Sequence, residues 1–242
     1  MSAVAAPLCR GVLAHGDIAP WLQRRITYLA VFFIVLVAGQ AAVVRADIPW
    51  KEVKRRVTAE NEKLAKRPGG RAGTYFVVCT VYYTPKESGF TADRGFDVTP
   101  VAAAGLKGRK FPRDFLDAVK LEGFGRVSEP MKGLNYIRYQ GRGRYSFASE
   151  PLGRGTTVLV PRQSAAARGV KLFKPGQVLV IEDSEIRKIF GSTEWTVADT
   201  GGGLRRWQLD LYWGEDEPLD PQFLARPKGT LFEYGYAEAK IK

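Results

Sequence analysis

The run Thr74–Thr84 (TYFVVCTVYYT) constrains the fold of this chain more than any other segment. β-Branched and aromatic residues fill it, which is typical of a strand that is buried on both faces. Further short runs of strand-like residues follow, separated by turns rich in glycine and proline. They lie near 124–129, 134–139, 145–148, 156–160, 177–182, 195–199, 207–213 and 230–241. Many short strands with few helices predict a mainly β fold, a small β-barrel with insertions.

Three segments have helical patterns instead. Residues 48–66 place apolar side chains on one face, and Pro49 suits a first-turn position. The stretch 67–71 (RPGGR) ends this helix and is typical of a linker. Shorter helices are predicted around 112–121 and 184–190, so we expect one N-terminal helix to precede the barrel.

The N-terminal segment has the features of a secretory signal. The basic pair Arg24-Arg25 precedes an apolar run from Ile26 to Ala38, and small residues follow up to Ala46. This run is too short to span a bilayer. An uncleaved anchor is the alternative, but the basic cluster at 51–56 would then lie on the exported side, against the positive-inside rule. We therefore expect an exported protein of the periplasm or cell envelope.

These boundaries divide the chain into three parts. We predict a signal peptide over 1–46, an amphipathic helix with its linker over 47–73, and a barrel domain over 74–242 with an insertion around 101–150. If the signal is cleaved, no stable membrane partner is expected, and we expect a monomer.

Histidine and cysteine are scarce, and this limits the chemistry. The single histidine, His15, and one of the two cysteines, Cys9, lie in the predicted signal peptide. Without a histidine in the mature domain, Ser-His-Asp triads, Cys-His pairs and imidazole zinc sites are excluded. Cys79 lies inside the first strand and is expected to be buried. We expect no cofactor and no metal. A calcium site of Asp199, Asp210, Glu150 and the acidic stretch Glu215-Asp216-Glu217 is an alternative that no EF-hand-like spacing supports.

A predicted strand at 195–199 ends in an acidic residue that three glycines follow, within the run WTVADTGGG. Glycines adopt backbone angles that other residues avoid, and they let a ligand approach the main chain closely. The simpler interpretation is a tight turn whose amides Asp199 caps, and taken alone this run favours it.

Eleven residues after Asp199, a second acid lies inside the strand-like run Trp207–Gly214 (WQLDLYWG). Alternation places Gln208, Asp210 and Tyr212 on one face of this strand. Aspartate is disfavoured within strands, so its presence needs an explanation. Either these residues form a solvated face, or Asp210 is a carboxyl in a groove, where desolvation raises its pKa and lets it act as a general acid.

Together the two runs resemble a known signature. Asp199-Thr200-Gly201-Gly202, the basic Arg205 and Asp210-Leu211-Tyr212 resemble the D-T-G-G-x-I-K-G-x-x-x-D-[LIV]-[FY] pattern of the 3D (Asp-Asp-Asp) domain. Residues 79–85 (CTVYYTP) are similar to the T-A-Y-T-P opening of such barrels, and 173–178 (FKPGQV) to I-P-L-G-T-x-V. This domain is the core of the membrane-bound lytic murein transglycosylase A family. The resemblance implies a six-stranded double-psi β-barrel with Asp210 as catalytic acid and Asp199 as its supporting carboxylate.

The chain departs from that pattern at two points. The lysine-glycine of the family is Arg205-Arg206 here, which keeps the charge but replaces a point charge with a planar fork. The first acid of the family has no clean match; Glu150, before Pro151, is the candidate third acid. We expect substrate contacts from the following residues: Tyr83, Gly201, Gly202, Arg205, Gln208 and Tyr212.

The resemblance implies a glycan-cleaving enzyme that acts on peptidoglycan or a related glycan. A lytic transglycosylase would form a 1,6-anhydro product, whereas a hydrolase would consume water. A non-catalytic, expansin-like carbohydrate-binding barrel is the alternative from another class. The net charge of +12 suits an anionic wall polymer or simply a basic soluble surface. No recognised nucleic-acid module is present in the sequence, so nucleic acid is not expected as a partner.

Overall fold

A computed structural model describes residues 48–70, 72–90, 99–153, 157–169, 172–216 and 235–242. The predicted signal peptide, with His15 and Cys9, lies outside the described residues, as does the part of the last predicted strand before residue 235. No helix among the described residues is long and apolar enough to cross a membrane.

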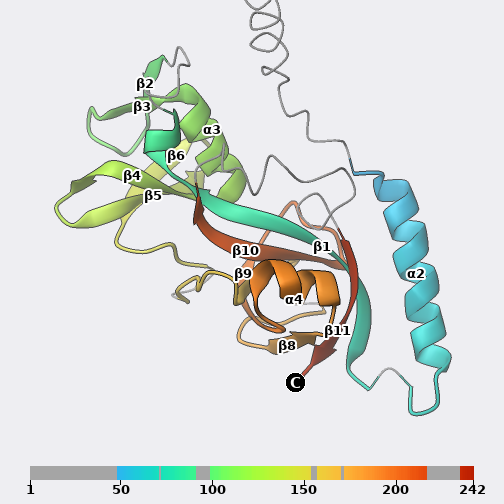
Figure 1. Cartoon of the computed structure of the whole chain (residues 1–242). Helices are drawn as coiled ribbons and strands as arrows, with labels where there is room; N and C mark the ends of the chain where they lie inside the picture. The colour runs from blue at the N-terminus through green and yellow to red at the C-terminus, as the bar shows by residue number, and fades with distance from the viewer. Residues whose placement is uncertain (1–47, 71, 91–98, 154–156, 170–171, 217–234) are drawn as a thin grey trace, which may run out of the picture. The chain divides into compact units, whose positions relative to one another are not determined.

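Six strands close into a barrel in the order β1-β10-β7-β9-β8-β11 (Figure 1). They are β1 (Thr74–Pro85), β7 (Ser164–Ala167), β8 (Val178–Ile181), β9 (Glu194–Thr200), β10 (Gln208–Asp216) and β11 (Gly235–Ile241). The pairs β1/β10 and β7/β9 are parallel, and the other four pairs are antiparallel. This confirms the predicted mainly β class with a closed six-stranded barrel.

Side chains from all six strands fill the barrel interior. Trp195, Leu209 and Leu211 are each 0% exposed there, and Phe190 packs against Trp195 from the short helix α4 (Ser184–Phe190). Cys79 lies in the same interior as expected, and burial is the main cause that raises the pKa of its thiol. Its thiol is therefore protonated and unreactive at neutral pH.

One barrel strand was not predicted from the sequence. β7 consists of Ser164, Ala165, Ala166 and Ala167, and alanine is depleted in strands. All four residues are buried, because β7 lies between β10 and β9. Ala165 and Ala167 face the filled interior, where larger side chains would not fit. A strand predicted over 156–160 is wrong for the described residues 157–160, which form only the isolated bridge of Leu152 with Val158.

A small lobe (residues 100–148) has its own core. It contains β2 (Pro100–Ala102), β3 (Lys110–Pro112), α3 (Arg113–Glu122), β4 (Phe124–Met131), β5 (Leu134–Gly141) and β6 (Arg144–Ala148). Phe111, Phe115 and Ile137 are 0% exposed in this core, and Phe90 of the short helix η1 (Glu87–Phe90) joins it.

Polar contacts join the lobe to the barrel strand β10. The Tyr136 hydroxyl donates to Glu215 Oε1, and Arg126 Nη1 donates to Tyr136 Oη at 3.0 Å. Arg126 also lies 3.7 Å from the Glu215 carboxylate. Since Glu215 follows Asp210 on β10, this network ties the lobe to the strand that carries the predicted catalytic acid.

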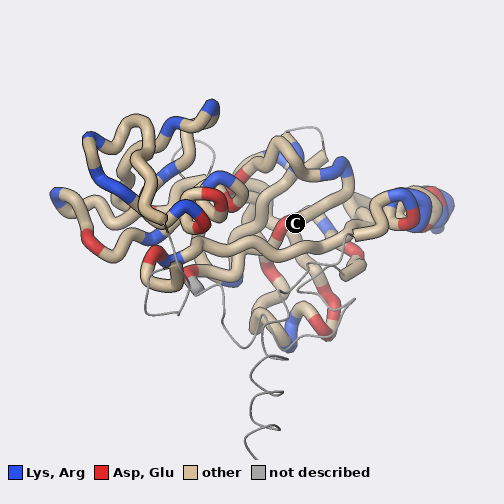
Figure 2. The backbone as a smooth tube through the Cα atoms, turned by 90° about the horizontal axis from the view of Figure 1, so that it is seen from above, with Lys and Arg blue, Asp and Glu red and all other residues tan. Residues whose placement is uncertain are grey.

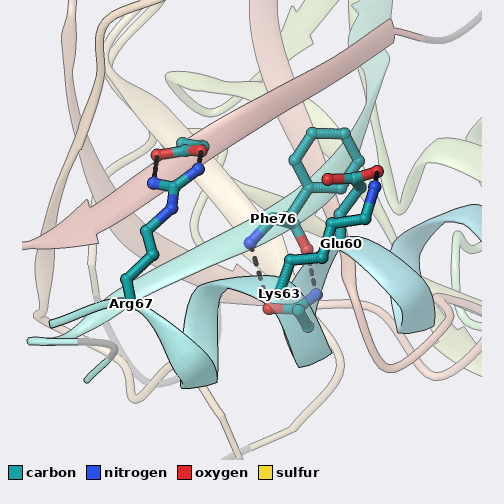
Figure 3. A network of polar contacts seen from close by, with 6 residues as sticks. Glu60, Lys63, Arg67 and Phe76 are labelled. Carbon is teal, nitrogen blue, oxygen red and sulfur yellow. Dashed lines mark hydrogen bonds and ion pairs between the residues drawn. The ribbon is translucent and has the colours of Figure 1, made fainter.

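The N-terminal helix α2 (Trp50–Lys66) is present as predicted, and its buried face is Val53, Val57, Asn61 and Leu64. Asn61 bonds to the main chain of β1: Nδ2 donates to the Phe76 carbonyl at 2.7 Å, and the Phe76 N–H donates to Oδ1 at 3.1 Å (Figure 3). β10 pairs with β1 only from Val78 onward, so the Asn61 amide takes the place of a strand partner at Phe76. Arg67 adds an exposed ion pair with Glu238.

Replacing Asn61 with alanine should lower the free energy of unfolding by about 1–3 kcal/mol, because a buried main-chain donor and acceptor would lose their partners. Urea unfolding measures this. The control is Glu60→Ala, which removes an exposed pair with Lys63 and should change stability by less than about 0.5 kcal/mol. Equal effects of the two substitutions would contradict the role assigned to Asn61.

Candidate functional site

The strand register places the two predicted acids in one row across the barrel wall. Thr80 on β1 pairs with Asp210 on β10, Asp210 pairs with Ala166 on β7, and Ala166 pairs with Asp199 on β9. Ala166 belongs to a cluster outside the barrel interior, so this row faces outward. Two strand spacings separate the Cα atoms of Asp210 and Asp199, about 10 Å. The methyl group of Ala166 is the only side chain between them in the row.

A chain of hydrogen bonds ends on the Asp210 carboxylate. The Arg205 N–H donates to Gln208 Oε1 at 2.9 Å, and Gln208 Nε2 donates to Thr80 Oγ1 at 2.8 Å. Thr80 Oγ1 in turn donates to Asp210 Oδ1 at 2.7 Å. Because a carboxylate oxygen can only accept, the Thr80 proton points at Asp210, while a lone pair of the same hydroxyl accepts from the Gln208 amide. The chain therefore sets the orientation of the Asp210 carboxyl, which is half-buried.

Asp199 lies at the end of β9, also half-buried, and its Oδ1 accepts the N–H of Thr200 at 2.7 Å. The loop that carries Glu150 passes over this strand. A Cβ at Gly153 would lie 2.0 Å from the Ala198 carbonyl oxygen, so only glycine allows so close a contact. The loop thus reaches Asp199, while the side chain of Glu150 itself is exposed to solvent.

The three glycines after Asp199 differ from the prediction in their backbone angles. None of them has a positive φ, so unusual backbone angles do not explain them. A Cβ at Gly201 would lie 2.7 Å from Leu204 Cγ, whereas Gly202 and Gly203 have no atom within 4 Å of a Cβ position. Gly201 is therefore required for packing, and the other two leave their main chain open to a ligand.

Other predicted contact residues are engaged within the protein. The Arg205 guanidinium lies 5.1 Å from the centre of the Trp50 ring on α2. Gln208 is 6% exposed and Tyr212 is 1% exposed, and the Tyr212 hydroxyl bonds to Thr84 Oγ1 at 2.8 Å. Tyr83 is half-buried and packs against the barrel core rather than on the face of Asp210.

Tyr82 lies on the face of the two acids, although we did not predict it as a site residue. Its ring centre is 5.0 Å from that of Tyr212, and it packs in one cluster with Ala166 and Ala198. Its hydroxyl is buried and has no hydrogen-bond partner within the described chain. Burial, and after it the charges of Asp199 and Asp210, raise the pKa of Tyr82 well above its usual value. Alternation with Thr80 along β1 was the sequence signal for this face.

Glu122 is a second residue that the sequence did not reveal. It ends α3 in the small lobe, and its Oε2 accepts the N–H of Tyr83 at 3.4 Å. Its charge also contributes to the raised pKa of Tyr82, behind the contributions of burial, Asp199, Asp210 and Tyr212. A carboxylate from the lobe therefore contacts β1 beside Tyr82, through a contact between segments that no local pattern encodes.

Two further features bear on what the site can bind. Within the described ranges, no group of three or more His, Cys, Asp or Glu side chains is placed to hold a metal ion. A hollow of about 440 Å³ is lined by Thr74, Val180, Glu182, Asp183, Glu238 and Lys240. Thr74 precedes Thr80 by six strand residues, about 20 Å, so this hollow is separate from the two acids.

Comparison with known proteins gives structural likenesses only. No family model and no curated protein sequence matches the chain. Among solved structures, E. coli MltA with bound chitohexaose has a TM-score of 0.44 at 13% identity, over 78% of this chain and 82% of that one. A membrane-bound lytic murein transglycosylase from Agrobacterium tumefaciens has a TM-score of 0.44 at 12% identity, over 93% and 94%. The lytic transglycosylase LtgG of Burkholderia pseudomallei has a TM-score of 0.36 at 13% identity, over 69% and 71%.

Replacing Tyr82 with phenylalanine should raise the melting temperature, because it removes a buried hydroxyl that has no partner. The raised pKa of Tyr82 also means that the folded state loses stability as the pH rises above about 10, where the unfolded phenol ionises. The variant should lack that part of the alkaline loss. Thermal melts from pH 7 to 11 test both effects, with Tyr145→Phe as the control for the effect at pH 7. Tyr145 donates to the Leu116 carbonyl, so its replacement should lower the melting temperature at pH 7.

The substitutions Gly201→Ala and Gly202→Ala should distinguish a glycine needed for packing against Leu204 from one that leaves the main chain accessible to a ligand. Gly201→Ala forces Leu204 to move and should cost about 1–3 kcal/mol of stability. The methyl group added by Gly202→Ala would have no atom within 4 Å, so the urea midpoint should stay unchanged. The same methyl group should weaken the binding of any ligand that lies against the main chain there. A large loss of stability for Gly202→Ala would contradict this assignment.

Proposed function

We propose that this chain is an exported enzyme that cleaves the glycan strand of peptidoglycan as a lytic transglycosylase, with Asp210 as general acid and base. The sequence resemblance at 199–212 supports this, and one observation of the structure carries it. Asp210 is a half-buried carboxyl inside a strand, with one oxygen bonded to Thr80 and a second acid in the same row. A solvated structural aspartate needs no such arrangement.

The first step is proton donation to the glycosidic oxygen. Since Oδ1 of Asp210 accepts the Thr80 proton, the proton that Asp210 donates is carried by Oδ2. Its transfer lets the bond between the sugar C1 and the leaving oxygen break, and positive charge develops on the ring. The leaving sugar keeps the proton as a new hydroxyl.

In the second step the ionised Asp210 acts as a base. It takes the proton from the C6 hydroxyl of the muramic acid ring, and O6 attacks C1 to close the 1,6-anhydro product. Asp210 regains the proton that it donated, so no water is consumed. One carboxyl therefore serves both steps, which suits a mature domain without histidine.

Asp199 and Tyr82 have supporting roles in this mechanism. The charge of Asp199, about 10 Å from Asp210 between Cα atoms, would stabilise positive charge on the sugar ring. The Tyr82 phenol is neutral at neutral pH, and its raised pKa keeps it neutral under alkaline conditions too, so it adds an O–H dipole near both acids but no charge. Open main chain at Gly202 and Gly203 gives the glycan room beside Asp199.

Hydrolysis with inversion is the second candidate, and the strand offset between the two acids is compatible with it. Inverting enzymes keep their carboxyl groups about 6.5–9.5 Å apart so that a water fits between substrate and base, whereas retaining enzymes need about 5–5.5 Å. The offset of two strands between Asp210 and Asp199 is compatible with the larger spacing. In that case Asp199 would activate the water.

Asp210→Asn tests the function directly. With purified peptidoglycan, the wild type should release soluble anhydro-muropeptides, identified by mass spectrometry, and the variant should be slower by about 10²–10⁴-fold or more. Asp117→Asn removes an exposed carboxylate on α3 and should keep full activity.

The products decide between the candidates. Reducing ends in place of anhydro ends would indicate hydrolysis. A wild type that sediments with peptidoglycan but releases nothing would contradict the enzyme and favour a carbohydrate-binding barrel.

A further inference from the structure

Three turns of the small lobe share an unusual residue pattern. Each places a cation and then a glycine at two successive positions with positive φ: Lys107 (37°) and Gly108, Lys132 (51°) and Gly133, Arg142 (52°) and Gly143. Met131 pairs with Leu134, and Gly141 pairs with Arg144, so the second and third are two-residue hairpin turns. In the first, the Arg109 N–H donates to the Leu106 carbonyl at 3.1 Å across the turn.

A cation is a poor choice for these positions. Two consecutive residues with positive φ favour Asn-Gly, Asp-Gly or Gly-Gly, because the short polar or absent side chain tolerates the left-handed region. Lysine and arginine are strained there and add no hydrogen bond to the turn. Turn formation therefore does not explain why the lobe uses a cation three times.

Ion pairing does not explain them either. Lys107, Lys132 and Arg142 are all exposed, and within the described chain none of them has an ion-pair partner. Over residues 100–148 the chain has ten Lys and Arg against four Asp and Glu, so the lobe carries half of the net charge of +12. In Figure 2, blue segments mark the turns of the lobe at the left of the view.

The spacing of the cations indicates the shape of the partner. Lys132 and Arg142 lie at opposite ends of β5, whose eight residues span about 25 Å. This exceeds the screening length of roughly 8 Å at physiological salt, so the cations do not form one compact anion site. They suit an extended polymer that carries anionic groups at intervals.

We propose that the three turn cations of the small lobe bind the carboxylates of the peptidoglycan stem peptides and hold the polymer on the enzyme. The inference rests on the proposed substrate, but it concerns retention of the polymer and needs no bond cleavage.

The test uses a triple variant that preserves the turns. Lys107→Asn, Lys132→Asn and Arg142→Asn remove three charges and supply the residue that the turns prefer, so the melting temperature should stay the same or rise. In an Asp210→Asn background, which keeps the polymer intact, co-sedimentation with purified peptidoglycan at 0.15 M salt should be about 10-fold weaker for the triple variant. Peptidoglycan whose carboxyl groups are amidated should bind the Asp210→Asn parent as weakly as untreated peptidoglycan binds the triple variant.

Two controls show whether a change in binding comes from the lost positive charges or from the substitution itself. Ala72→Asn introduces asparagine outside the lobe, at another residue with positive φ before a glycine, without removing a charge, and should leave binding unchanged. Arg142→Lys keeps the charge and should also bind normally.

Equal binding by the triple variant and its parent would overturn the inference, and so would full binding of the amidated polymer. The proposed function fails separately, if the wild type releases no soluble product. In that event a loss of binding by the triple variant would still support the cationic surface.

Discussion

The parallel pairing of β1 with β10 is the contact on which the rest of this structure depends. These strands are 130 residues apart at Thr80 and Asp210, and no local interaction brings them together. Their pairing buries apolar side chains inside the barrel and places the Thr80 hydroxyl on the Asp210 carboxylate. The helix α2, the lobe helix α3 and the Tyr136–Glu215 contact all attach to one of these two strands. The site and its supports therefore all depend on this pair of strands.

Hydrogen bonds that orient the polar side chains, rather than a large number of charged groups, organise the site. Three successive hydrogen bonds lead from the Arg205 main chain to Asp210, and the bond from the Arg205 N–H sets the orientation of the Gln208 amide. Tyr82 is the opposite case, since its hydroxyl is buried without a partner. A buried unpaired hydroxyl reduces stability, and such costs are commonly tolerated at functional sites. The two features together distinguish this row of residues from the rest of the barrel surface.

Much of the architecture could be predicted because it depends on local patterns. The helix over 50–66 follows from its apolar spacing, and α4 over 184–190 begins after Asp183, whose carboxylate caps two N–H groups. Alternation in 207–213 placed Asp210 and Tyr212 on the face opposite Leu209 and Leu211, as the structure has them. β7 was missed because its alanines have low strand propensity, and they are required only by the neighbouring strands that enclose them.

By itself, the sequence determined the fold class, the strand face of Asp210 and the absence of histidine chemistry beyond residue 46. These properties depend on residue type and on periods of two or 3.6 residues, which can be read along the chain. Only the tertiary structure decided that Ala166 separates the two acids, that Tyr82 rather than Tyr83 lies beside them, and that Trp50 engages Arg205. Those facts arise from pairing between distant strands and from packing of separate segments, and neither leaves a local pattern in the sequence.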